Sequence, residues 1–298
     1  YNGDQTVYDV AYYNLTIGGM SGIKQGSATK NLTVSNELKL IDGGQLLTAK
    51  DVQVNGKLSM SGDSVLELGG NLVLPKVTVI SDPNYNVNYG YELGDNSTIV
   101  YNSAEDRVIL NIDYNNLEIS GKGVKSLEVI KNYRGEVTDQ DLLVNGNMKV
   151  VGAEATDEFS FALPGELQVG GDLILQHNGR VDVSGKLGVN GDVTFGKNSE
   201  MILLVGGDFL MGGTFDAGLG TIRYVGADQQ IIAGNYYNVE FINGSGLSGM
   251  VTKQSDSDIS AQKISVYENV YLKVKSAAVN DSFLVLNHDG VTPGNSVV

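Results

Sequence analysis

Residues 163–195 read LPGELQVGGDLILQHNGRVDVSGKLGVNGDVTF. Apolar residues alternate with other residues in short runs, as in Leu167-Val169 and Leu173-Leu175. Successive side chains of a β-strand point to opposite faces, so a period of two residues predicts strands with one buried face. The same alternation occurs from Leu15-Ile17 to Val239-Phe241, and no helical apolar stripe accompanies it. The sequence therefore predicts an all-β fold with strands of about 4–6 residues.

A recurring corner joins these runs. It consists of an apolar residue, any residue, Gly, a polar or charged residue, and then apolar residues at alternate positions. Copies are VNGKLSM (54–60), LGGNLVL (68–74), VNGNMKV (144–150), LPGELQV (163–169), VGGDLIL (169–175), VSGKLGV (183–189), VNGDVTF (189–195) and VGGDFLM (205–211). We expect Gly here because a tight corner requires a positive φ, and Asp or Asn because they tolerate the left-handed region and bond to nearby backbone.

Regular corners between short strands fit either hairpins or a solenoid. The corner glycines Gly171, Gly191 and Gly207 are separated by 20 and 16 residues, a suitable length for one rung. The apolar residues also recur as columns of Val, Leu and Ile, which parallel stacking buries. We therefore predict a single domain over residues 1–298, an elongated right-handed parallel β-solenoid, or β-helix, with short strands and Gly-Asp or Gly-Asn corners.

A longer repeat is superimposed on this pattern of short strands and corners, and it divides the chain into units 1–100, 101–223 and 224–298. The units open with YNGDQTV, YNSAEDRV and YVGADQQI, and continue with YYNLTIGG, DYNNLEISG and NYYNVEFING. This alignment makes Asn14, Asn116 and Asn238 equivalent. It also pairs Tyr12-Tyr13 with Tyr236-Tyr237, which we interpret as structural stacks.

The two ends of the sequence match each other. Joined to the start, GNSVV at 294–298 gives NSVV-YNGDQTV, which resembles NSTIV-YNSAEDRV at 96–108. Neither end resembles the polar cap that a solitary solenoid needs, and uncapped ends are sheet edges that template further pairing. We therefore expect the segment to continue head to tail with copies of itself, either within one longer chain or by assembly of subunits. The predicted end-to-end contact residues are Tyr1, Val7, Val297 and Val298.

Composition excludes several classes of function. The chain has no Cys and only two His, so thiolate zinc sites, disulfide scaffolds and three-His metal sites are excluded. A formal net charge of −15 disfavours nucleic acid and anionic lipid as partners. No apolar run approaches the ~18 residues of a membrane-spanning helix, so no membrane insertion is expected.

The block YNGDQTV and YYNLTIGG, followed by the corner repeats quoted above, resembles repeats in large secreted surface proteins of Bacteroidota. These include gliding-motility adhesins and other cargo of the type IX secretion system. The resemblance extends over essentially the whole chain. It implies a β-solenoid, secretion, and an adhesive or structural role outside the cell or at its surface.

The candidate ligand-binding residues are Tyr85, Tyr89 and Tyr91. They lie among Asn and Gly in DPNYNVNYGYELG (82–94), a segment that interrupts the repeat. Tyr and Asn combine a flat apolar face with hydrogen bonds, which suits sugars or protein surfaces. The alternative is a corner loop packed on itself.

Two acidic clusters are candidates for chemistry, because paired carboxylates can act on glycosidic bonds. One contains Asp139 and Asp141, and the other contains Glu154, Asp157 and Glu158. Solvated loop charge is the favoured interpretation of both. Calcium in these loops stays open, but no cofactor and no dedicated metal site is predicted, and the Gly-Asp corners lack the nine-residue period of calcium-binding repeats.

Three functions compete at this stage. The first is an extracellular structural or adhesive rod that stacks head to tail through uncapped end strands. The second is a carbohydrate-binding adhesin segment that contacts surface glycans. The third, least favoured, is a polysaccharide-active β-helix enzyme, so the leading prediction is a protein without enzymatic activity.

Overall fold

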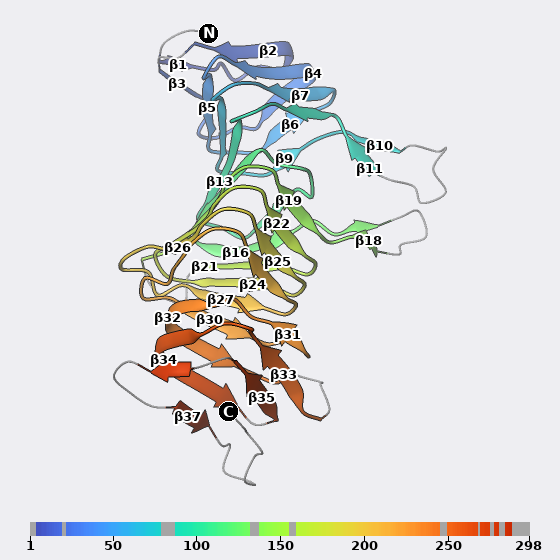
Figure 1. The fold of residues 1–298 in the computed structure, drawn as a ribbon. Coiled ribbons are helices and arrows are strands. Elements are labelled where there is room, and N and C mark those ends of the chain that lie inside the picture. Colours follow the sequence, from blue (N-terminus) through green and yellow to red (C-terminus); the bar gives the residue numbers. More distant parts are fainter. Residues whose placement is uncertain are drawn as a thin grey trace. The chain divides into compact units, whose positions relative to one another are not determined.

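The computed structural model describes residues 4–19, 22–78, 87–131, 137–154, 159–244, 249–267, 269–274, 277–279 and 284–287. These residues form strands and turns and contain no helix. The strands are mostly parallel and stack as the rungs of a β-solenoid, which confirms the predicted fold class (Figure 1). Since it holds no helix, the described part of the chain also has none long and apolar enough to cross a membrane.

Two compact units, Tyr1–Lys149 and Val150–Val298, divide the chain. Their boundary falls inside the second predicted repeat and within strand β20 (Met148–Val151). The stacked strands of the first unit are β1 (Gln5–Thr6), β2 (Tyr12–Gly18), β3 (Ile23–Gln25), β4 (Leu32–Ile41), β5 (Gln45–Thr48), β6 (Val52–Val54), β7 (Lys57–Met60), β8 (Val65–Leu68), β9 (Leu72–Val73), β12 (Tyr91–Leu93), β13 (Thr98–Ser103), β14 (Arg107–Ile109), β15 (Asn116–Gly121), β16 (Gly123–Leu127) and β19 (Leu142–Val144).

The first unit contains several parallel stacks. One has the order β1-β3-β5-β8-β13-β15. A second is centred on β4, which pairs with β2 on one side and with both β6 and β7 on the other. Two antiparallel ribbons leave the stack, β10 (Lys76–Thr78) with β11 (Val87–Tyr89), and β17 (Ile130–Lys131) with β18 (Val137–Asp139), and both extend from the same side of this unit (Figure 1). Strand β11 belongs to the segment 82–94, which interrupts the sequence repeat.

The second unit continues the same pattern. Its strands are β21 (Phe159–Leu163), β22 (Leu167–Val169), β23 (Leu173–Gln176), β24 (Arg180–Val183), β25 (Leu187–Val189), β26 (Val193–Phe195), β27 (Ile202–Val205), β28 (Phe209–Met211), β29 (Phe215–Asp216), β30 (Thr221–Tyr224), β31 (Gln229–Gln230), β32 (Gly234–Phe241), β33 (Val251–Gln254), β34 (Ile259–Tyr267), β35 (Val270–Lys273), β36 (Ala277–Val279) and β37 (Leu284–Asn287). The parallel stacks run β21-β24-β27-β30-β32-β34, β22-β25-β28, β23-β26-β29 and β31-β33-β35. Both β36 and β37 pair with β34.

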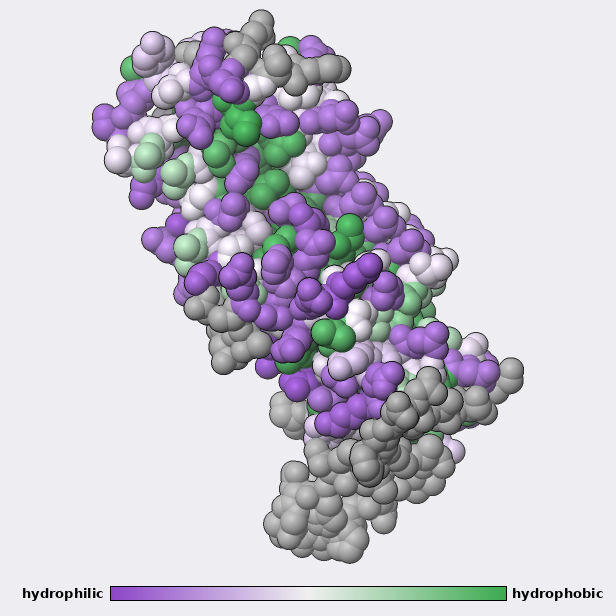
Figure 2. Space-filling model, turned by 90° about the vertical axis from the view of Figure 1, so that its left-hand side faces the viewer, coloured by the Kyte–Doolittle hydropathy of each residue, from purple (hydrophilic) through white to green (hydrophobic). Residues whose placement is uncertain are grey.

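The core consists of columns of apolar side chains that face their counterparts one rung away. Leu167 pairs with Leu187, which in turn pairs with Phe209, and all three side chains are buried. Burying apolar area stabilises the fold by about 25 cal/mol per Å², and each rung needs its neighbours to achieve this. Outward positions carry mostly hydrophilic residues, with small apolar patches between them on the face drawn in Figure 2.

The corner glycines are required for a reason other than the predicted one. Gly56, Gly146 and Gly207 do not adopt a left-handed φ, so the expectation of positive φ is wrong at these corners. Instead, the rungs approach each other too closely for a side chain. A Cβ at Gly56 would lie 2.0 Å from the carbonyl oxygen of Asn36, and one at Gly207 would lie 2.7 Å from the amide nitrogen of Lys186.

Corner carboxylates connect successive rungs. Asp172 Oδ1 accepts a hydrogen bond from the backbone N–H of Asp192 at 2.9 Å, and Asp192 Oδ1 accepts one from Thr214 at 2.6 Å. Asp208 Oδ1 accepts one from the N–H of Gln230 at 2.8 Å. The two bonds from Thr214, from its N–H and its hydroxyl, lower the pKa of Asp192. The Asp of a Gly-Asp corner therefore bonds mainly to the following rung, 20 or 22 residues later.

Replacing Gly207 with Ala is expected to lower the free energy of unfolding by about 1–3 kcal/mol, because the new methyl group would overlap rigid backbone of the preceding rung. Gly196→Ala is the matched control, since its Cβ would lie 3.6 Å from Gln176 Cγ, an ordinary contact. Urea unfolding of both variants tests the prediction. Equal midpoints for the two variants would contradict it.

Candidate functional site

Among the described residues, each sequence repeat contains one fully buried lysine. These are Lys24 on β3, Lys125 on β16 and Lys253 on β33, each with no exposed surface. They occupy the same register, because they pair with Gln5, Arg107 and Gln229, the residues that follow the first Asp of each repeat. Lysine is rarely buried completely, so its recurrence in all three repeats marks a conserved structural task of the fold.

The buried ammonium groups bind backbone carbonyl oxygens at a corner. Lys125 Nζ donates to the carbonyls of Glu105 at 2.9 Å and Ser103 at 3.3 Å, and also to that of Lys122. Lys253 Nζ donates to the carbonyls of Gly226 and Ala227 and to the side-chain oxygen of Gln229. Lys24 Nζ donates to the carbonyl of Gly22 at 2.9 Å.

Burial lowers the pKa of both Lys125 and Lys253 to about 8, and the nearby carboxylates of Asp106 and Asp228 act in the opposite direction. The ammonium group supplies donors to several carbonyl oxygens that converge at one corner, where buried acceptors need partners. The lysine is thus a structural clamp on the corner, and its geometry gives it no access to a substrate.

An aspartate holds the strand that carries each lysine. Asp4, Asp106 and Asp228 accept a hydrogen bond from the backbone N–H of the residue before the lysine, at 2.7, 2.8 and 2.7 Å. Sequence reasoning missed this cluster. The signal that could have found it is the recurrence of GIKQ (22–25), GVKS (123–126) and VTKQ (251–254) downstream of an Asp in every repeat.

A tyrosine pair also recurs. The hydroxyls of Tyr101 and Tyr114 lie 3.0 Å apart, and those of Tyr224 and Tyr236 lie 3.1 Å apart. All four side chains are buried, and burial raises the pKa of Tyr101 to about 12. The second tyrosine of each pair donates to the carbonyl oxygen four residues earlier, that of Leu110 or Ile232.

The first repeat contains the same tyrosine contact. Tyr12, the equivalent of Tyr114 and Tyr236, donates to the carbonyl oxygen of Tyr8 at 3.2 Å. The same contact from a tyrosine hydroxyl to the carbonyl four residues earlier therefore occurs in all three segments. Of the predicted tyrosine stacks, Tyr236 is buried, whereas Tyr13 and Tyr237 are 71% and 37% exposed.

The first repeat differs from the others in what it leaves exposed. Tyr8 is 70% exposed, whereas its equivalents Leu110 and Ile232 are 8% and 7% exposed. Val10 is 58% exposed, whereas its equivalent Ile112 is 4% exposed. The position of Tyr8 is therefore interior in the second and third repeats and surface in the first, and that of Val10 is interior in the second repeat.

The same region carries the terminal strands of the first unit. Among the described strands, β1 pairs only with β3, and β2 pairs only with β4. The equivalents of β2 are β15 and β32, and each has a parallel neighbour on the side of the preceding strand, β13 or β30. We call the surface formed by β1, β2, Tyr8, Val10 and Tyr13 the open edge.

Of the four predicted end-contact residues, the structure describes Val7 alone. Val7 is buried, and its backbone N–H donates to the carbonyl of Gln25 at 2.8 Å, so its side chain lies inside the unit. Tyr1, Val297 and Val298 lie outside the described residues.

The predicted ligand tyrosines are not brought together as a described cluster. Tyr91 on β12 is partly buried, and its hydroxyl accepts a hydrogen bond from the backbone N–H of Asp113 at 3.1 Å. Burial raises the pKa of Tyr91. Tyr89 is described only as backbone of β11, and Tyr85 lies outside the described residues. Tyr91 therefore anchors one segment of the first unit to another.

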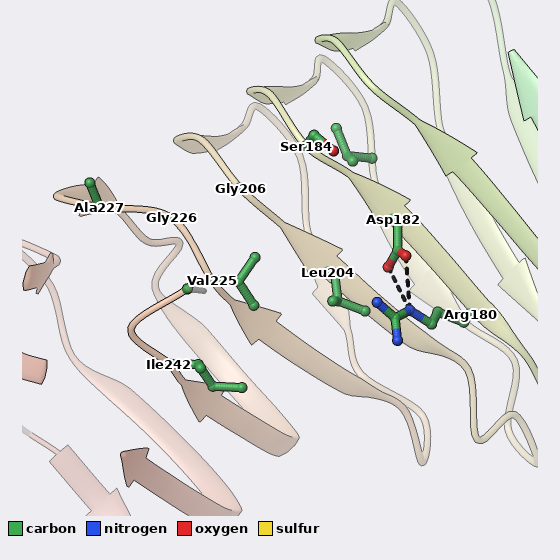
Figure 3. Close-up of a pocket in the computed structure, with 11 residues that line it drawn as sticks. Arg180, Asp182, Ser184, Leu204, Gly206, Val225, Gly226, Ala227 and Ile242 are labelled. Carbon is green, nitrogen blue, oxygen red and sulfur yellow. Dashed lines mark hydrogen bonds and ion pairs between the residues drawn. The ribbon is translucent and has the colours of Figure 1, made fainter. Parts of the chain in front are cut away.

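A groove of about 530 Å³ lies on the outer side of β24, β27, β30 and β32 in the second unit (Figure 3). The floor of the groove is lined by Leu204, Val225 and Ile242. Gly206 also lines the groove and adds no side chain to it. Glycine is needed at this position because a Cβ would lie 2.1 Å from the carbonyl oxygen of Ser184. At one end Arg180 Nε donates to both carboxylate oxygens of Asp182, at 2.8 and 2.9 Å. The side chains of Arg180 and Asp182 therefore form an ion pair with each other.

The acidic clusters offer little converging geometry. Asp141 and Glu154 are exposed, Asp139 is described only as backbone, and Asp157 and Glu158 lie outside the described residues. Within the described ranges, no group of three or more His, Cys, Asp or Glu side chains could hold a metal ion.

Comparisons of this chain with protein-family models, with curated proteins and with solved structures found no match.

Tyr236→Phe is expected to lower the free energy of unfolding by about 1–3 kcal/mol, because it removes a buried donor from the carbonyl of Ile232 and breaks the pair with Tyr224. Tyr237→Phe removes the hydroxyl of the exposed neighbour and is expected to stay within about 0.5 kcal/mol. Denaturant unfolding compares the two. An unchanged free energy of unfolding for Tyr236→Phe would show that the tyrosine pair does not stabilise the fold.

Lys253→Met is expected to flatten the pH dependence of stability between pH 8 and 9.5. The pKa of this lysine is about 8 when folded, against about 10.4 when unfolded, so the folded chain releases the proton first and stability rises with pH. The variant loses that rise, which is at most about 1.4 kcal/mol per pH unit. Lys263→Met, at an exposed position on β34, is the control. Urea unfolding midpoints measured across this pH range give the slope of stability against pH for each variant. The prediction is refuted if the slopes of both variants match that of the parent chain.

Proposed function

We propose that this chain is a structural and adhesive segment of an extracellular or cell-surface filament that grows by stacking copies head to tail. The observation that carries the proposal is the open edge. Tyr8 is exposed there at a position that both other repeats bury, and Val10 is exposed at a position that the second repeat buries, so this surface fits one more rung. On this proposal the protein works mechanically and is not an enzyme.

The physical basis is the shared hydrogen bonding of parallel rungs. A terminal strand presents a row of backbone N–H and C=O groups that template another strand. The edge strand β2 is seven residues long and carries exposed Tyr13, and Tyr8 and Val10 lie just before it. Folds that avoid such pairing place charges or Pro on their edges, and β2 has neither.

The charge of the chain favours stacking at the ends over association at the sides. A net charge of −15 makes copies repel each other wherever large surfaces meet. Burial of the exposed side chains of the open edge opposes this repulsion, and added salt strengthens association by screening the charges. A contact that joins two different surfaces without closing produces a linear filament.

The location and the adhesive role are supported by the resemblance to secreted Bacteroidota repeats. The absence of Cys is compatible with an exterior location, because the fold then depends on no redox state. The corner carboxylates support a structural role, since Asp172, Asp192 and Asp208 are engaged with the backbone of neighbouring rungs.

The proposal predicts concentration-dependent self-association of the purified chain, with linear particles by electron microscopy and a stronger effect at high salt. Tyr8→Glu combined with Val10→Glu places charge on the open edge, and we expect it to raise the concentration needed for association at least tenfold. Sedimentation velocity measures this.

The matched control is Leu210→Glu combined with Val73→Glu. These residues are also exposed apolar side chains, 57% and 45% accessible, but they lie on β28 and β9, away from the open edge. Self-association that responds equally to both pairs of substitutions would overturn the proposal, as would a monomer at all concentrations.

A further inference from the structure

We propose that Lys253 and Gln229 form an isopeptide bond within the chain, in which the side-chain nitrogen of Lys253 becomes bonded to Cδ of Gln229 and ammonia leaves. The bond joins strand β33 to strand β31, its neighbour in the parallel ladder. This inference concerns a covalent modification inside the second unit and does not depend on the proposed filament.

The two side chains meet in a buried corner. Gln229 and Lys253 face each other directly in the ladder of β31 and β33. Gln229 is 2% exposed, Lys253 has no exposed surface, and Nζ of Lys253 donates a hydrogen bond to Oε1 of Gln229. Because a carbonyl bond is only about 1.2 Å long, this contact brings Nζ within about 4 Å of Cδ, near the ~3–3.5 Å from which two atoms react.

The amide of Gln229 is held at both ends. Its Oε1 also accepts a hydrogen bond from the backbone N–H of Gly226 at 2.8 Å. Its Nε2 donates to the carbonyl of Val205 at 3.0 Å and to that of Gly207. These contacts fix the orientation of the amide. The N–H of Gly226 also stabilises the negative charge that develops on Oε1 when an amine attacks Cδ, as the donors of an oxyanion hole do.

Burial makes Lys253 more reactive than an ordinary lysine. It lowers the pKa of the ammonium group to about 8, and the carboxylate of Asp228 acts in the opposite direction. At this pKa about a tenth of the side chains are uncharged amines at pH 7, and about nine tenths are uncharged at pH 9. Only the uncharged amine has the free electron pair that attacks a carbonyl carbon.

The reaction balances without a co-reactant. The electron pair of the Lys253 nitrogen forms the bond to Cδ of Gln229, and the π electrons of the carbonyl move to Oε1. When the carbonyl forms again, the bond from Cδ to Nε2 breaks, and Nε2 leaves as ammonia with the proton that the lysine nitrogen gives up. Both groups are buried, so hydrolysis of the amide competes poorly.

The other buried lysines differ in what faces them. Lys125 pairs with Arg107, whose guanidinium group offers no carbonyl carbon to attack. Lys24 pairs with Gln5, but Gln5 is exposed, so its amide stays in contact with water. We therefore expect the bond at Lys253 and none at Lys125.

Peptide mapping of the folded chain tests the inference. The chain is incubated at pH 6 and at pH 9, digested with trypsin and analysed by mass spectrometry. We expect a branched peptide that joins Lys253 to Gln229, formed at least about tenfold faster at pH 9 because more of the lysine is uncharged. Loss of ammonia at Asn-Gly sequences such as Asn190-Gly191 gives the same decrease of about 17 Da, so the branched peptide identifies the bond and the intact mass does not.

Lys253→Arg is the matched variant, because it keeps a positive charge beside the carbonyl groups while its guanidinium group stays protonated and does not attack. It should give no branched peptide, whereas Lys125→Arg should form the bond at the rate of the parent chain. The parent chain unfolded in guanidinium chloride at pH 9 should also give none, because the two residues are then no longer held together. This last comparison needs no variant to fold.

Two outcomes overturn the inference. One is a folded parent chain that gives no branched peptide after prolonged incubation at pH 9. The other is a branched peptide that forms equally fast in the unfolded chain, which would show that the folded site contributes nothing. The pH dependence of stability predicted above for Lys253 belongs to the chain before this bond forms, because an amide nitrogen does not titrate in that range.

Discussion

Hydrogen bonding between parallel rungs is the constraint from which the rest of this structure follows. Rungs that share backbone ladders lie about 4.8 Å apart, and this spacing applies at the corners as well as along the strands. Side chains at the corners must therefore either be absent or bond to the next rung. Gly207 illustrates the first solution and Asp192 the second. The Gly-Asp corner is best understood as a contact between rungs, in which glycine permits the approach and aspartate uses it.

The buried lysines address the same constraint where a corner closes on itself. Several carbonyl oxygens converge in such a corner, and an unsatisfied buried carbonyl costs about 1–3 kcal/mol. One ammonium group can satisfy several of them, as Lys125 and Lys253 do. Desolvation of the ammonium opposes this gain and lowers its pKa. The cluster is thus a balance between two burial costs, and the buried lysine recurs in all three repeats.

Stacking has no intrinsic end. Every rung offers its neighbour the same ladder and the same apolar columns, so a solenoid stops only where a cap or a charge prevents another strand from adding. At the open edge Tyr8 is exposed, whereas its equivalents Leu110 and Ile232 are buried, and this difference supports the proposed filament role. The groove of the second unit and the anchored Tyr91 support ligand binding less well, because their polar groups already bind within the protein.

The sequence by itself determined the all-β class, the parallel solenoid and the three repeats, because period-two alternation and recurring corners are local patterns that need no knowledge of partners. It also located the equivalent Asn14, Asn116 and Asn238. Only the tertiary structure decided why the corner glycines are needed, since their close contacts come from residues about 20 positions away. It alone showed that the three lysines are buried, because the recurring GIKQ, GVKS and VTKQ mark an equivalent position but do not show whether its side chain meets carbonyl groups or solvent. Likewise, the exposure of Tyr8 depends on whether another rung covers it, and coverage is a property of the stack and not of the local sequence.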